Sequence, residues 1–164
     1  MLRRIVRGIV RWVVRGIGTF GFIGHLPLAP GTWASAAALA LWLVLPPAGL
    51  GLSIVGLILL IGVGTWTAHR LEADYGHDDH RVVIDEVAGS LIAIAGLPPH
   101  LSIAIVGFVL FRFFDIVKPP PIYQIQAMPG GIGVMIDDVL AGIFSNVVLR
   151  LLLAWNPGGF LAAG

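Results

Sequence analysis

Long apolar stretches separated by short polar segments dominate the chain. Residues 36–67 are apolar apart from a Pro-Pro-Ala-Gly break at 46–49. The piece before the break has about 11 residues, or roughly 16 Å as a helix, which is too short to cross a hydrocarbon core of about 30 Å. It would be re-entrant or extend upstream to Thr32. With the longer piece from Leu50 to about Arg70, it predicts a helical hairpin.

The segment between residues 16 and 35 differs, because its glycines and prolines argue against a long regular helix. We predict a loop there, with Thr32 or Ser35 capping the helix that follows. Residues 1–17 instead predict a basic amphipathic helix, in which Ile5, Ile9 and Trp12 alternate with arginines. Such a helix suits a surface of anionic lipid, and an ordinary positive-inside flank explains it equally well. Either interpretation places the N-terminus in the cytoplasm.

A second hairpin is predicted after an acidic loop at 71–84. It runs from Asp85 to Leu97 and from Leu101 to Val117, across a turn containing two prolines. A Pro- and Gly-rich loop at 118–133 precedes a last apolar helix, from about Ile136 to Trp155. The predicted fold is therefore an all-α, polytopic membrane bundle of two hairpins and a final helix. It occupies residues 18–155 and leaves a short tail at 156–164.

Composition supports the membrane assignment. Hydrophobic residues make up 57% of the 164-residue chain and charged residues 12%, where soluble domains average about 25% charged. The mean hydropathy is +0.94. All nine acidic residues lie between Glu72 and Asp138, and the two predicted hairpins bring most of them to one face. The absence of cysteine excludes disulfides and thiolate chemistry, and nothing indicates a nucleic-acid partner.

Adjacent carboxylates at Asp85 and Glu86 begin a predicted helix. Interaction with the helix dipole is one explanation, but a single acidic residue suffices for that. Two carboxylates beside an apolar stretch fit a cation better, since burying unpaired charge is costly. Oxygen ligands of this kind suit Mg²⁺, which takes a few carboxylates together with water and phosphate.

Arg112, Asp115 and Lys118 share one strip of a predicted helix, at spacings of three residues. A salt-bridged helix end is the simpler explanation. The functional hypothesis has Asp115 on a metal ion and the two cations on phosphate oxygens.

A glycine-rich sequence at 130–133 precedes Asp137 and Asp138. Glycines such as Gly130 and Gly131 allow backbone N–H groups to approach an anion at a helix start, although such a motif alone usually marks only a flexible turn. Cations, clustered carboxylates and no thiol together favour metal-assisted phosphoryl hydrolysis.

Three other classes remain as alternatives. A small cation or proton transporter would place its carboxylates within the spans, whereas these lie at predicted helix ends. A CDP-alcohol phosphotransferase would carry a motif that begins Asp-Gly, which does not occur here. A soluble oligomeric relative would pack its apolar helices against one another.

Four motifs resemble the phosphatidylglycerophosphatase A family over roughly residues 16–150. They are Pro30-Gly31-Thr32 with Ser35, Asp78 seven residues before Asp85-Glu86-Val87-Ala88-Gly89, the run Phe111-Arg112-Phe113-Phe114-Asp115-Ile116-Val117-Lys118-Pro119, and Gly130 to Gly142 with its Asp137-Asp138 pair. Ala34 and Pro120 depart from the family pattern, and the basic N-terminus lies outside it. The resemblance implies a bacterial, all-helical, Mg²⁺-dependent enzyme that converts phosphatidylglycerophosphate to phosphatidylglycerol and phosphate.

Together, the residues and the resemblance predict a lipid phosphatase of the bacterial inner membrane whose site faces the cytoplasm. The oligomeric state, the metal stoichiometry and the choice between a water and an aspartate nucleophile stay open. The predicted catalytic residues are Asp85, Asp115, Lys118 and Asp137. The predicted phosphate-binding residues are Thr32, Arg112, Lys118, Gly130 and Gly131. The predicted metal ligands are Asp78, Asp85, Glu86, Asp137 and Asp138.

Overall fold

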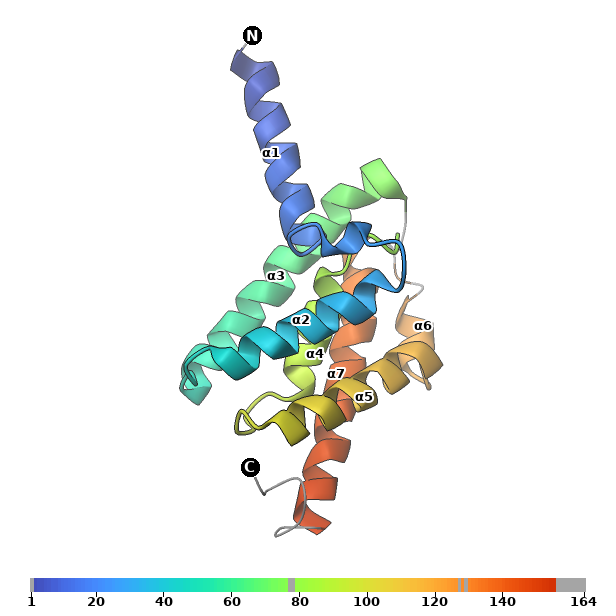
Figure 1. Ribbon diagram of the computed structural model, residues 1–164. Coiled ribbons are helices and arrows are strands. Elements are labelled where there is room, and N and C mark those ends of the chain that lie inside the picture. The colour runs from blue at the N-terminus through green and yellow to red at the C-terminus, as the bar shows by residue number, and fades with distance from the viewer. Residues whose placement is uncertain (1, 77–78, 127, 129, 156–164) are drawn as a thin grey trace.

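The computed structural model describes residues 2–76, 79–126, 128 and 130–155, and this part of the chain is helical without strands. The all-α prediction is therefore confirmed (Figure 1). The helices are α1 (Leu2–Gly18), α2 (Pro30–Val44), α3 (Leu50–Tyr75), α4 (Ile84–Ala93), α5 (Leu101–Val117), α6 (Ile122–Gln126) and α7 (Gly131–Trp155), with a 3₁₀ turn, η1 (Ile23–His25), before α2.

Helix α7 is the central element of the bundle and packs against α3, α4, α5 and α6. Helix α2 lies across α4 and α5, whereas α3 packs against α4 and α7 (Figure 1). Helices α2 and α3, which form the first predicted hairpin, therefore make most of their contacts with later helices. The two-hairpin arrangement itself stays a prediction. Helix α1 contacts α3 and extends away from the rest of the molecule.

Helix α2 begins earlier than the sequence pattern predicted. Its first residue is Pro30, and Ala29 precedes it in the left-handed conformation without a side-chain cap. Capping by Thr32 or Ser35 is therefore wrong, and the Ser35 hydroxyl instead donates to the Gly31 carbonyl at 2.9 Å. Proline suits the first helical position because its fixed φ is helical and its missing N–H would have no partner there.

Helix α7 also begins earlier, at Gly131, so the predicted loop to residue 133 is too long. A side chain at Gly131 would collide with the Thr65 carbonyl and would lie 2.6 Å from the His69 amide nitrogen of α3. This close backbone contact requires glycine and lets the first turn of α7 pack against α3. Asp137 and Asp138 consequently lie in the second turn of α7 and not at its start.

Two glycines bring α4 and α7 together. A side chain at Gly89 of α4 would lie 2.7 Å from the Asp138 carbonyl oxygen, and one at Gly142 of α7 would collide with the Gly89 carbonyl. Small residues at a helix crossing allow the backbones to approach closely, as is common in membrane bundles. The crossing therefore fixes the carboxylates of α4 near those of α7.

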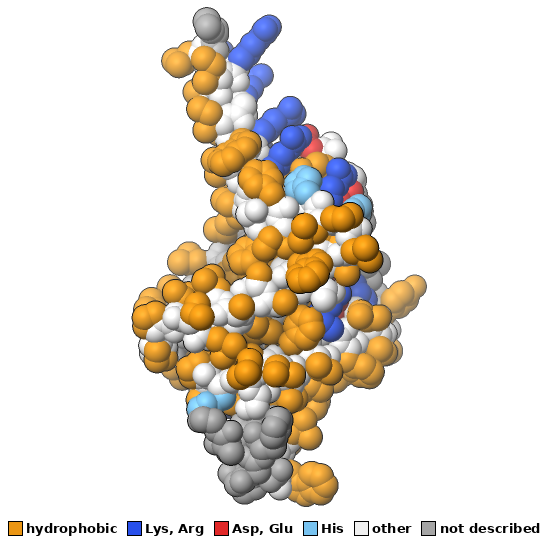
Figure 2. All heavy atoms as spheres, in the orientation of Figure 1, with side chains coloured by type: hydrophobic (Ala, Val, Ile, Leu, Met, Phe, Trp, Pro, Cys, Tyr) orange, Lys and Arg blue, Asp and Glu red, His pale blue; other side chains and the backbone are white. Residues whose placement is uncertain are grey.

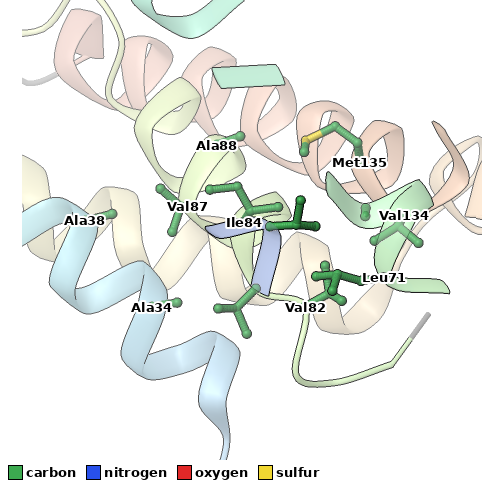
Figure 3. Close-up of a cluster of buried hydrophobic side chains, with 12 residues drawn as sticks. Ala34, Ala38, Leu71, Val82, Ile84, Val87, Ala88, Val134 and Met135 are labelled. Carbon is green, nitrogen blue, oxygen red and sulfur yellow. The ribbon is translucent and has the colours of Figure 1, made fainter. Parts of the chain in front are cut away.

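The largest cluster of buried hydrophobic side chains lies beside this crossing. It joins α2, α3, α4 and the start of α7, whose side chains point toward one another in Figure 3. Its labelled members are Ala34, Ala38, Leu71, Val82, Ile84, Val87, Ala88, Val134 and Met135. Because several members are alanine or valine, the helices pack at short range.

The outer surface of the bundle is strongly apolar (Figure 2). Helices α3 and α7 are each long and apolar enough to cross a membrane, with mean hydropathies of 2.0 and 1.8 over their most apolar windows. Only 11% of the α3 window is buried inside the protein, and Leu52, Ile58 and Leu59 are each more than 60% exposed. Such a face is typical of a helix that contacts lipid.

A candidate metal and phosphate site at four helix ends

Four helix ends meet at the site. The first turn of α4 carries Asp85 and Glu86, the last turns of α5 carry Arg112 and Asp115, and the second turn of α7 carries Asp138. The fourth is the start of α2, which approaches the Glu86 carboxylate. Residues from distant parts of the sequence thus come together, as the sequence predicted.

Three carboxylates form a group that could hold a metal ion. One ligand oxygen from each of Asp85, Glu86 and Asp138 lies within 4.8 Å of the others. Asp85 is 7% exposed and Asp138 is 3% exposed. Among the described residues, no hydrogen-bond donor reaches Asp85 Oδ1, Glu86 Oε2 or Asp138 Oδ2. Buried carboxylate oxygens without donors are costly, so the donor set fits a hard, oxygen-binding cation such as Mg²⁺.

The crowding of these groups shifts their ionisation. Burial, followed by repulsion from Glu86 and Asp138, raises the pKa of Asp85 well above its usual range. Burial also raises the pKa of Glu86, although the nearby Arg112 guanidinium partly opposes that shift. A bound cation would reverse this effect, because positive charge favours the ionised carboxylates.

Arg112 lies beside the carboxylate group. Its Nη1 atom is 2.7 Å from Asp115 Oδ2, three residues further along α5, and 4.0 Å from Glu86 Oε1. The three side chains are each less than 20% exposed. Arg112 therefore neutralises part of the negative charge and holds Asp115 at the edge of the site.

Lys118 makes the second cation contact, with Asp137. Its Nζ donates to Asp137 Oδ2 at 2.6 Å, and the Asp137 side chain is only 5% exposed. Burial alone would lower the pKa of Lys118, but the hydrogen bond and the charge of Asp137 raise it overall. Asp137 thus contacts a lysine, whereas Asp138 joins Asp85 and Glu86. Lys118 itself adopts the left-handed conformation that ends α5.

The start of α2 completes the site. A side chain at Gly31 would collide with Glu86 Oε1, so only glycine allows this helix to come so close. Gly31 belongs to the Pro30-Gly31-Thr32 motif but is not among the site residues that the sequence predicts. Its position just inside a helix start, after Pro30, is the signal that could have identified it. Thr32, which the sequence did assign, follows Gly31 in the same half-exposed first turn.

The remaining predicted site residues are two glycines and one aspartate. Gly130 has a positive φ of 74° and faces His69, and Gly131 packs against α3. Close packing against α3 therefore explains why both positions are glycine. Their phosphate-binding role stays a prediction. Asp78 lies outside the described residues.

The arrangement defines a class of site. Buried oxygen ligands for a divalent cation lie next to one arginine and one lysine, on an all-helical bundle with an apolar surface. Such a site can hold a metal ion and a phosphate group together, as phosphoryl-transfer chemistry requires.

Comparison with known proteins identifies the family. Residues 16–153 match the model of the phosphatidylglycerophosphatase A family, and the chain belongs to it. The chain is therefore an enzyme of the phosphatase class.

Three curated relatives cover most of the chain. A Haemophilus influenzae phosphatidylglycerophosphatase A is 37% identical over 80% of this chain and 83% of its own. An Escherichia coli phosphatidylglycerophosphatase A is 34% identical over 92% and 88%. A Bacteroides thetaiotaomicron protein, described provisionally as a phosphatidylinositol-3-phosphatase, is 40% identical over 82% and 90%. No solved structure matches the chain.

Proposed function

We propose that this protein is a Mg²⁺-dependent lipid phosphatase that hydrolyses phosphatidylglycerophosphate to phosphatidylglycerol and inorganic phosphate at the cytoplasmic face of the membrane. The observation that carries the proposal is the meeting of Asp85, Glu86 and Asp138 next to Arg112, in a chain of the phosphatidylglycerophosphatase A family. Each of these residues comes from a motif that resembles that family.

Asp85, Glu86 and Asp138 would hold the metal ion through their buried oxygens. When bound, Mg²⁺ neutralises phosphate charge and lowers the pKa of a coordinated water. Asp115, which lies close enough to raise the pKa of Glu86, would orient the group that attacks phosphorus. Asp78 and Asp137 are proposed as further metal ligands. In this conformation Asp137 accepts a hydrogen bond from Lys118.

Arg112 and Lys118 would bind the substrate phosphate. Both cations already contact carboxylates, so the phosphate would share or replace the contacts with Asp115 and Asp137. The raised pKa of Lys118 keeps its ammonium group protonated at neutral pH. Lys118 therefore serves as a cation that stabilises phosphate charge and not as a proton acceptor. Thr32, in the first turn of α2, would add its side-chain hydroxyl as a donor, because its backbone N–H already donates to the Ala29 carbonyl.

The polar ends of two helices support the proposed placement at the membrane. Gly130, at the start of α7, faces His69 near the end of α3, where the charged residues Arg70 and Glu72 also lie. The site and the polar end of α3 are therefore on one side. The arginines of the N-terminal helix favour the cytoplasm for that side.

Phosphate release by purified protein tests the assignment. We expect release from phosphatidylglycerophosphate with Mg²⁺, none after chelation, and little from soluble glycerol 3-phosphate. Asp138→Asn should abolish turnover, because it removes a charge from the proposed metal group. Asp79→Asn is the matched control, since Asp79 pairs with Arg81 outside the site. Wild-type turnover by Asp138→Asn would refute the metal assignment.

A second substrate is worth testing because of the Bacteroides thetaiotaomicron relative. Phosphatidylinositol 3-phosphate also presents a phosphate monoester at a membrane surface. The same assay should therefore compare the two lipids at equal surface concentration. Faster release from the inositol lipid would replace the proposed substrate but leave the proposed site intact.

A further inference from the structure

Helix α1 carries none of the residues proposed for the reaction. It extends beyond the bundle, and only Val14 and Gly18 of its 17 residues are buried (Figure 1). The family match begins at residue 16, so nearly all of α1 lies outside it. If α1 binds another surface, that surface must be complementary to both faces of the helix.

The two faces of α1 differ sharply. Arg3, Arg7, Arg11 and Arg15 recur every four residues and therefore share one side, with Arg4 beside them. Apolar side chains cover the opposite side, where Ile5 is 50% and Ile9 is 58% exposed. Figure 2 shows these two sides as separate blue and orange strips along the helix. This pattern is typical of helices that lie in the headgroup region of a membrane.

The contact between α1 and α3 combines apolar and basic side chains, as such a role requires. A groove of about 610 Å³ separates the two helices, and its lining includes Val10, Arg11, Trp66 and Arg70. The Arg70 guanidinium lies 5.6 Å from the centre of the Trp66 ring. Tryptophan next to arginine, at the point where an apolar helix becomes polar, marks the membrane–water interface. Helix α1 therefore meets α3 at the level of the lipid headgroups.

We propose that α1 and this groove bind the surface of a bilayer that contains anionic phospholipid. The apolar face of α1 would enter the interface, and the arginines of α1 and Arg70 would contact lipid phosphates. Asp74 binds Arg15 at 3.1 Å and Arg11 at 3.7 Å, which fixes the C-terminal half of α1. Within the described chain no carboxylate pairs with the other three α1 arginines.

Charge decides in favour of lipid over a second copy of the chain. Two α1 helices packed through their apolar faces would cover the exposed apolar side chains but would leave Arg3, Arg4 and Arg7 on the outer sides without an anionic partner. Anionic lipid instead supplies both an apolar cover and negative charge. This proposal does not depend on the catalytic assignment.

Site-directed spin labelling of the full-length protein tests the proposal, because the native sequence has no cysteine. Ile9→Cys places the label on the apolar face. Gly8→Cys is the matched control on the arginine side, where an added side chain meets nothing within 4 Å. The protein is placed in nanodiscs of phosphatidylcholine alone or of an equal mixture with phosphatidylglycerol. Accessibility to oxygen and to a water-soluble nickel complex then reports the depth of each label.

We expect the Ile9 label to be lipid-exposed only in the anionic discs and the Gly8 label to stay accessible to nickel in both. Replacing Arg3, Arg4 and Arg7 by glutamine should lower the equilibrium constant for docking of α1 on the anionic surface on the order of a hundredfold. Each basic residue near such a surface contributes roughly a fivefold factor. High salt should act in the same direction.

Two results would overturn the proposal. One is an Ile9 label that is equally accessible to nickel in both kinds of disc. The other is strong coupling between labels on two copies, which would show that α1 pairs with itself.

Discussion

The Glu86 side chain depends on a glycine that comes from another helix. Gly31 lies so close to Glu86 Oε1 that any side chain at position 31 would displace the carboxylate. In the proposed site Glu86 is a metal ligand, and residues that orient ligands affect metal affinity nearly as strongly as the ligands do.

We therefore predict that Gly31→Ala lowers the affinity for Mg²⁺ by roughly 10–100-fold, the range for residues that orient metal ligands. The Mg²⁺ dependence of phosphate release measures this. Gly51→Ala in α3 is the control, because a side chain there meets nothing within 4 Å, and it should leave the dependence unchanged. An unchanged Mg²⁺ dependence in Gly31→Ala would exclude Glu86 as a ligand.

The contact between Lys118 and Asp137 is a second feature at the scale of single residues. Asp137 is almost fully buried, so removal of the lysine leaves a buried charge without its cation. We predict that Lys118→Met lowers the free energy of unfolding by about 3 kcal/mol, the lower end of the range for broken buried pairs. Denaturation in detergent measures this loss.

A double variant separates this effect on stability from the effect on catalysis. Lys118→Met combined with Asp137→Leu should recover much of the stability, because the buried carboxylate that Lys118 neutralised is then also gone, and it should remain inactive. If the double variant is no more stable than the single one, the pair does not stabilise the fold as we propose.

At the scale of whole helices, α4 is short and ends inside the bundle. Its C-terminal carbonyls are bound by α7: Asn146 Nδ2 donates to the carbonyls of Ile92, Ala93 and Ala95 at 3.0–3.1 Å. Arg150 also donates to the Ala95 carbonyl, at 2.8 Å. Since Ala93 and Ile94 at this end are almost fully buried, these side chains supply the partners that the last turn lacks. Helix α7 therefore fixes α4 at both ends.

The glycine crossing of the two helices leads to a prediction. Gly89→Ala should push α4 away from α7, lower the free energy of unfolding by roughly 1–3 kcal/mol and weaken Mg²⁺ binding, because the ligands lie on both helices. Thermal unfolding with and without Mg²⁺ measures both effects. The outward-facing Gly56→Ala is the control and should be neutral or slightly stabilising. Equal behaviour of the two variants would contradict the close crossing.

At the scale of the whole molecule, the apolar surface and the polar ends set the orientation in a membrane. Helix α3 separates the loop at 45–49 from the polar segment that carries His80 and leads into α4. If α3 crosses the bilayer, these two segments lie on opposite sides of it.

Single-cysteine labelling in sealed vesicles measures the sides directly. We predict that His80→Cys reacts with an impermeant maleimide only from the cytoplasmic side and Ala48→Cys only from the opposite side. Ala48 precedes α3 and His80 follows it. Neither residue belongs to the proposed site, so each variant should retain activity. Reaction of both cysteines from one side would show that α3 does not cross.

The sequence alone determined the helical class, the apolar surface and most helix positions, because these follow from local periodicity and from chain breakers. Helix α5 ends at Val117, as predicted, since Pro119 stops it just beyond Lys118. The starts of α2 and α7 were missed, because packing of Gly31 on Glu86 and of Gly131 on α3 involves residues distant in sequence.

Only the tertiary structure could distinguish between the two adjacent aspartates of α7. Neighbouring residues on a helix point about 100° apart, so Asp138 joins Asp85 and Glu86 whereas Asp137 faces Lys118. The sequence placed both in one motif and assigned both to the metal. Which of them joins the carboxylates of α4 depends on how α7 is rotated against α4 and α5, and that rotation is set by the glycine contacts between the helices.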